Sequence, residues 1–156
     1  MAQALFYQLG GAPLEALVAT LATRALAQGW PVELRGTERA RMQVLDTQLW
    51  LGPQDGFLPH GLSGGPADAR QPLLLTHTPG SAANSPRALM AIDGAEIELA
   101  EAARLERVWV IFDGSLPDAL DRARGQWRDL TGAGIAAQYW EDLGGRWVKK
   151  AERPAG

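Results

Sequence analysis

The strongest constraint on the fold is the way the hydrophobic pattern changes over the first fifty residues. Residues 3–8 form a short apolar run that is closed by the glycines at positions 10–11. From Pro13 onward, apolar side chains recur at the three- and four-residue spacing of a helix. Residues 31–35 predict a second strand, and a second helical pattern follows Thr37, which is a suitable N-cap. A strand-helix-strand-helix order favours a parallel sheet with helical crossovers.

The same alternation continues after a segment rich in Gly and Pro at residues 50–85. Further strands are predicted at residues 72–77, 88–93, 107–112 and 135–140, with a returning segment at 146–148, and further helices at 97–105 and from a cap at Ser115 to Leu130. We therefore predict an α/β, Rossmann-like, three-layer fold, in which a mostly parallel sheet has helices on both faces. One domain is expected over residues 1–148, and residues 149–156 are expected to form a flexible tail.

Composition excludes several classes of protein. The chain has no cysteine, which rules out disulfides and Cys-ligated metals, and its 46% hydrophobic and 21% charged content is that of an ordinary globular domain. A net charge of −3 argues against a protein that coats DNA through a broad basic face. The N-terminal residues lack the pattern of a signal peptide, and no membrane-spanning run is visible. We therefore expect a cytoplasmic protein with no membrane partner.

No arrangement of residues typical of an enzyme is found. The glycines at 10–11 fit neither dinucleotide nor P-loop motifs, and His60 and His77 lack the spacing of metal ligands. No nucleophile elbow exists. We predict no catalytic residue, no metal and no cofactor. Two alternatives stay open: a small nucleotide-dependent enzyme that uses the loop at 10–11 and Asp113, and a module that binds single-stranded DNA directly through Trp and Arg side chains.

The last predicted helix contains the sharpest candidate site. Arg124, Trp127 and Arg128 fall at positions i, i+3 and i+4, so two guanidinium groups lie beside one indole on adjoining parts of a helix face. This face suits a short acidic peptide, whose carboxylates would pair with Arg while an apolar side chain packs against the Trp ring. The alternative is a solvated Arg face beside a half-buried Trp.

A second candidate lies in the Gly- and Pro-rich segment. Trp50 and Phe57 flank Pro53 there, and aromatic side chains fixed by prolines on a loop are typical anchors of a protein interface. The alternative is a loop that packs as a lid on the edge of the sheet.

These residues together resemble the family of chi subunits of bacterial DNA polymerase III. The specific part is Leu-Asp-x-x-Leu-Trp at residues 45–50, followed by Pro53 and by Phe-Leu-Pro-His-Gly-Leu at 57–62. The strand with Phe-Tyr at 6–7 and the Arg-x-x-Trp-Arg sequence at 124–128 support it, as does the order of elements over most of the chain. The resemblance implies a non-catalytic accessory subunit that has lost nucleotide binding.

The resemblance also implies partners. One surface would bind the acidic C-terminal tail of single-stranded DNA-binding protein, so that DNA is contacted mainly indirectly. Arg124 matches a tail-binding Arg, Trp127 stands where the family usually has Tyr, and Arg128 stands where Lys is common. Leu120 falls where a further Lys is expected, and Arg122 is the candidate to replace that cation.

A different surface would bind the psi subunit of the clamp loader. Trp50, Phe57 and Pro59 match the loop that faces psi in the family. The resemblance also implicates this loop in binding an XPD-like helicase.

Overall fold

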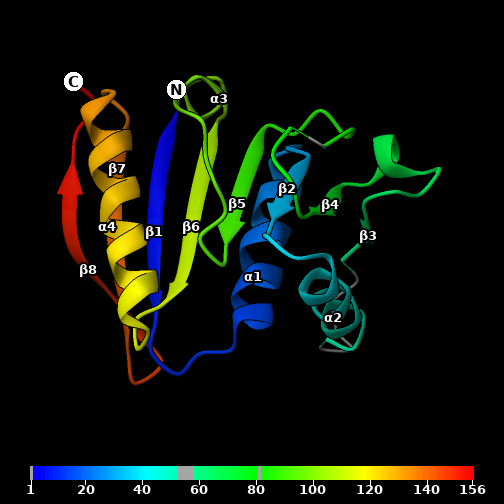
Figure 1. Cartoon of the computed structure of the whole chain (residues 1–156), viewed down its shortest axis with the longest axis horizontal. Helices are drawn as coiled ribbons and strands as arrows, with labels where there is room; N and C mark the ends of the chain where they lie inside the picture. The colour runs from blue at the N-terminus through cyan, green and yellow to red at the C-terminus, as the bar shows by residue number, and fades with distance from the viewer. Residues whose placement is uncertain (1, 53–57, 81) are drawn as a thin grey trace.

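The computed structural model describes residues 2–52, 58–80 and 82–156, which form a mixed sheet with helices on both faces (Figure 1). The strands are β1 (Gln3–Leu9), β2 (Val32–Arg35), β3 (His60–Leu62), β4 (Leu73–Thr76), β5 (Ala88–Ile92), β6 (Arg107–Asp113), β7 (Ala136–Leu143) and β8 (Arg146–Arg153). The helices are α1 (Leu14–Ala27), α2 (Arg39–Trp50), α3 (Leu99–Arg104) and α4 (Pro117–Gly132), with a short 3-10 helix at Asp68–Arg70. This architecture confirms the predicted fold class.

The order of strands across the sheet is β3-β4-β2-β5-β6-β1-β7-β8. Among the described strands the neighbours are parallel except β7 and β8, which are antiparallel. β1 lies between β6 and β7, so the start of the chain pairs with its last third. β5 is buried throughout, which agrees with its continuous apolar sequence, because a parallel strand covered on both faces has no solvated side.

Two apolar cores lie on opposite faces of the sheet. The first, which includes Leu34 and Met90, packs under α1 and α2. The second, which includes Phe6, Leu89 and Val110, packs under α3 and α4. Leu89 and Met90 are consecutive residues that point into different cores, as the alternation of side chains along a strand requires. In Figure 1, α4 runs in front of β7, and β1 is visible beside it.

Two predicted helix caps are wrong. The N-cap of α2 is Glu38 and not Thr37. α4 begins at Pro117, a residue suited to the first helical position because the amide it lacks would have no partner inside the helix. Ser115 donates through its amide and its hydroxyl to the Asp113 carboxylate. Ser115 therefore stabilises the turn before α4 and does not cap the helix.

The C-terminal residues form an outer strand, which corrects the tail predicted at residues 149–156. β8 extends to Arg153 and pairs along its length with β7. Gly144 and Gly145 form the turn between the two strands with φ of 65° and 86°, a conformation that glycine adopts without strain. Exposed Lys side chains on an edge strand oppose pairing with other chains, so the polar sequence that predicts a tail also suits an exposed edge strand.

The Gly- and Pro-rich segment at residues 50–85 is not one continuous loop. It contains β3, the 3-10 helix and β4, of which only β4 was predicted. β3 lies at the end of the sheet opposite β8, next to α2 (Figure 1). Within the described ranges, no helix is long and apolar enough to cross a membrane.

Candidate functional site

The indole of Trp127 is held between α4 and the sheet. α4 buries Ala123, Gln126 and Leu130, and Trp127 lies at the margin of that buried face. Its ring meets Phe6 edge-on at a centroid distance of 5.3 Å and meets Tyr139 of β7 at 6.1 Å. Such edge-to-face contacts fix the orientation of the indole. One side of Trp127 is therefore part of the core, and the other borders the surface.

A hollow of about 460 Å³ lies between α4 and the last two strands, and we call it the α4 hollow. It contains all three residues of the predicted peptide site: its lining residues are Arg124, Trp127, Arg128, Tyr139, Glu141, Lys150 and Ala151. The side chain of Arg124 is 60% exposed, and its nearest acid, Asp121, is 3.9 Å away. Such a long contact between exposed groups adds little stability, so this guanidinium can rearrange toward a ligand.

Hydrogen bonds through Gln8 connect Tyr139 and Glu141, two of the residues that line the α4 hollow. The Tyr139 hydroxyl donates to Gln8 Oε1, and Gln8 Nε2 donates to Glu141 Oε2 over 3.3 Å. Burial raises the pKa of Tyr139, the Glu141 carboxylate raises it further, and Arg124 opposes both. Tyr139 therefore stays neutral at physiological pH and keeps its donor role. Lys150 Nζ lies 3.8 Å from Glu141 Oε1.

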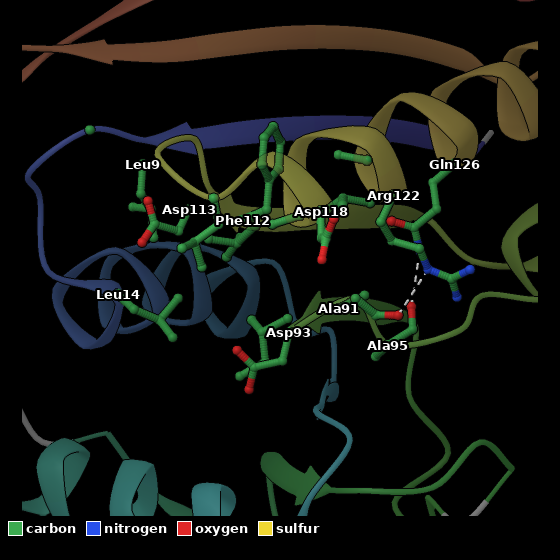
Figure 2. Close-up of a pocket in the computed structure, with 18 of the residues that line it drawn as sticks. Leu9, Leu14, Ala91, Asp93, Ala95, Phe112, Asp113, Asp118, Arg122 and Gln126 are labelled. Carbon is green, nitrogen blue, oxygen red and sulfur yellow. Dashed lines mark hydrogen bonds between the residues drawn. The ribbon is translucent and has the colours of Figure 1, made fainter.

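Arg122 does not join the α4 hollow. Its Nε donates to the carbonyl of Gly94 over 3.2 Å, and it lines a different cavity, shown in Figure 2. Arg122 and Arg124 are two positions apart, which is roughly 200° around a helix, so the two side chains point to different sides of α4. Leu120 is half-buried and packs against the core under α4. Lys150 of β8, which the sequence analysis did not name, lines the α4 hollow.

The cavity in Figure 2 has a volume of about 740 Å³ and lies at the carboxyl ends of β1, β5 and β6, where doubly wound folds bind nucleotides. The donors that would hold a phosphate there are already used. Asp142 Oδ2 accepts from the backbone amides of Gly10, Gly11 and Ala12 at 3.3, 2.9 and 2.8 Å, and Oδ1 accepts from Gly145 at 2.8 Å. These bonds, led by the one from Gly11, lower the pKa of Asp142. The side-chain carboxylate of Asp142 therefore occupies the position in which an anionic ligand would bind.

The charges around this cavity also disfavour a nucleotide. Asp93, Asp113 and Asp118 surround it (Figure 2). Asp93 pairs with Arg41 at 3.4 Å, so that cation is already neutralised. The bonds from Ser115 lower the pKa of Asp113, which keeps that carboxylate charged. No group of three residues able to bind a metal occurs in the part of the chain that the structure describes.

The second predicted interface has an apolar exposed surface at the end of α2. Trp50 is 51% exposed and stacks on the buried imidazole of His60 at a centroid distance of 4.1 Å. Val44 and Leu51 are also exposed, at 53% and 78%. We call Val44, Trp50 and Leu51 the α2 patch. His60 is held by contacts to the carbonyls of Leu58 and Asp46, so it supports Trp50 from below.

The other two residues predicted at this interface are Phe57 and Pro59. Phe57 lies outside the described residues. Pro59 is half-buried and lines a shallow hollow beside Trp30 and Pro72. Of the two that the structure describes, Trp50 lies on the exposed apolar surface and Pro59 lines a different hollow.

A protein-family model matches residues 1–138, and its description is DNA polymerase III chi subunit, HolC. The chain belongs to the DNA polymerase III chi subunit family. The match covers the sheet from β1 to the first residues of β7, and β8 lies beyond it. A comparison with curated proteins found no match. Chi subunits are accessory subunits of DNA polymerase III, so this chi protein belongs to DNA replication.

Proposed function

We propose that this chi subunit links the clamp loader to single-stranded DNA-binding protein and performs no chemistry itself. The α4 hollow binds the acidic C-terminal tail of single-stranded DNA-binding protein. The α2 patch binds the psi subunit of the clamp loader, or an XPD-like helicase in its place. The protein acts in the cytoplasm and touches DNA mainly through its partner.

One observation carries the first half of this proposal. Arg124, Arg128 and Lys150 surround a hollow whose wall consists of the rings of Trp127 and Tyr139. Glu141 is the acid that lines it, so three cations face one carboxylate. A tail that ends in a carboxylate, with adjacent acids and an aromatic residue, matches both the charge and the apolar wall.

The contacts predict weak, salt-sensitive binding. The cations are exposed, so their attraction for carboxylates is screened by salt, and a disordered tail loses conformational entropy when it binds. Many tails are displayed on one DNA strand coated with the binding protein. Their multivalency raises the effective affinity, so a modest single contact is enough to hold the polymerase near its template.

The arrangement of the two surfaces supports simultaneous binding. α4 and β8 lie at one end of the sheet, and α2 and β3 lie at the other (Figure 1). A tail in the α4 hollow would not overlap a folded partner on the α2 patch. The α2 patch exposes aromatic and aliphatic side chains, as the centres of stable protein interfaces do.

The occupied loop at residues 10–12 supports the absence of nucleotide chemistry. A bound phosphate would have to displace Asp142 from three backbone amides. If the protein were a nucleotide-dependent enzyme, millimolar ATP, NAD or S-adenosylmethionine would raise its melting temperature by mass action. We expect no shift. A direct single-strand binder would bind oligonucleotides alone, and we expect little such affinity.

The test of tail binding is a titration with a peptide of about ten residues that matches the C terminus of single-stranded DNA-binding protein from the same organism. Arg124→Ala and Arg128→Glu should each weaken binding about three- to tenfold while the circular dichroism spectrum stays unchanged. Arg122→Ala is the matched control, because that side chain lies outside the hollow. Unchanged affinity in both hollow variants would remove this site.

A further inference from the structure

The pairing between β7 and β8 has an irregularity beside the α4 hollow. Trp140 pairs with Lys149 and Tyr139 pairs with Ala151, so the register skips Lys150. An extra residue of this kind is a β-bulge, which bends the strand and changes the direction of the side chains next to it. As a result, the consecutive residues Lys150 and Ala151 both line the α4 hollow.

The bulge determines which side chain lies opposite the ring of Tyr139. In an unbroken register Lys150 would lie opposite Tyr139, and Ala151 would point to the other face of the sheet. With the bulge, the small Ala151 takes the place opposite Tyr139, and Lys150 lies beside it on the same face. The ring of Tyr139 is therefore left accessible, and a cation is kept next to it.

The partner of Lys150 within the chain is Glu141, and their contact is loose. The two charged groups are 3.8 Å apart, and the side chains are 46% and 29% exposed. Glu141 also accepts from Gln8 Nε2, so it keeps a hydrogen bond if Lys150 turns away. Because an exposed pair at this distance has little net stability, a carboxylate from outside can replace Glu141 as the partner of Lys150.

We propose that Lys150 is the third cation of the tail-binding site and that Glu141 neutralises it until a carboxylate of the tail takes its place. This inference rests on the proposed function. Neither Leu120 nor Arg122 supplies the cation expected from the family resemblance. Leu120 packs on the core, and Arg122 donates to the carbonyl of Gly94. The missing cation comes from β8, beyond the residues matched by the family model.

The test uses the same tail peptide, labelled for fluorescence anisotropy, on the full chain. Lys150→Ala should weaken binding about threefold, Lys150→Glu about tenfold, and Lys150→Arg should bind like the wild type. Lys149 gives the matched control: it is the adjacent lysine, it pairs with Glu152 at 3.2 Å, and it does not line the hollow. Glu141→Gln should strengthen binding about twofold, because it removes the competing charge and keeps the shape.

The outcomes separate this inference from the function on which it rests. Equal effects of Lys149→Glu and Lys150→Glu would mean that only the overall charge matters, and this would overturn the role of Lys150. Loss of binding in Arg124→Ala, with unchanged binding in Lys150→Ala and Lys150→Glu, would overturn it while tail binding stands. No binding by the wild type would overturn both proposals. Thermal melts of every variant show whether the hairpin still folds.

Discussion

The two ends of the sheet have opposite kinds of surface. At the β8 end, the α4 hollow combines three cations with two half-buried rings. At the β3 end, the α2 patch consists of three exposed apolar side chains. The first surface suits a charged, flexible segment whose attraction is electrostatic, and the second suits a folded partner that buries apolar area. The difference supports the proposal that one domain binds two chemically distinct partners without competition between them.

The largest effect should come from reversing the charge at one end only. The double variant Arg124→Glu and Arg128→Glu should weaken binding of the tail peptide by about a hundredfold or more, because attraction becomes repulsion at both guanidinium positions. Co-purification with psi should stay unchanged. Loss of psi binding in this variant would break the comparison, since it would make the two ends depend on each other.

Replacing one Trp at each end with Ala should lower the stability of the fold by different amounts. Trp127→Ala should lower the free energy of unfolding by about 2–3 kcal/mol, because the ring packs against Phe6 and Tyr139. Trp50→Ala should cost about 1 kcal/mol or less, since half of that ring is already exposed. Chemical denaturation measures both values, and equal costs would show that Trp50 is a core residue.

Trp50→Ala should instead weaken the psi contact about tenfold, as expected for an aromatic anchor. Affinity for the tail peptide should not change. Co-purification and peptide titration on the same preparation check both points. If tail binding falls as well, the α2 end has a structural role only.

Salt should change the binding affinities of the two ends by different, smaller factors. Raising NaCl from about 50 to about 300 mM should weaken tail binding about tenfold, because exposed charges are screened. The psi contact should change about twofold or less, since apolar burial is insensitive to salt over this range. Similar salt dependence at both ends would contradict the difference in their chemistry.

The smallest expected effect is the loss of stability at low pH. Hydrogen bonds lower the pKa of Asp142 below its ordinary value of 3.8, so its contribution to stability is present above that value and is lost as pH falls through the folded pKa. Acid should therefore loosen the β7–β8 hairpin before the α2 end, which hydrogen exchange at low pH can follow. Asp142→Asn should show a shallower loss of melting temperature below about pH 4. Asp118→Asn, on the exposed first turn of α4, is the control.

Local periodicity was enough to predict much of this structure, whereas contacts between residues far apart in the sequence could not be predicted. The spacing of Arg124, Trp127 and Arg128 placed them on one helix face, and the structure brings them together at the α4 hollow. The same helical geometry argues against Arg122, which lies on another side of α4. Lys150 could not be predicted, because its position depends on the register of a bulged edge strand.

The hydrogen bonds from the loop before α1 to Asp142 could not be predicted from the sequence either. Asp142 lies more than a hundred residues from the amides of Gly10, Gly11 and Ala12, and no local pattern links them. The position of the glycines between a strand and a helix suggests a phosphate site, and in the fold their amides donate to Asp142 instead. A loop that would bind an anion in related folds is here bonded to the hairpin that completes the α4 hollow.

The most direct measurement is an NMR titration of the indole N–H signals with the tail peptide. The chain has six Trp residues, and single Trp→Phe variants assign each signal. The account predicts that the signal of Trp127 shifts in a saturable way that Arg124→Ala weakens, while the signal of Trp50 at the other end stays in place. A shift of Trp50 with Trp127 unmoved would contradict it.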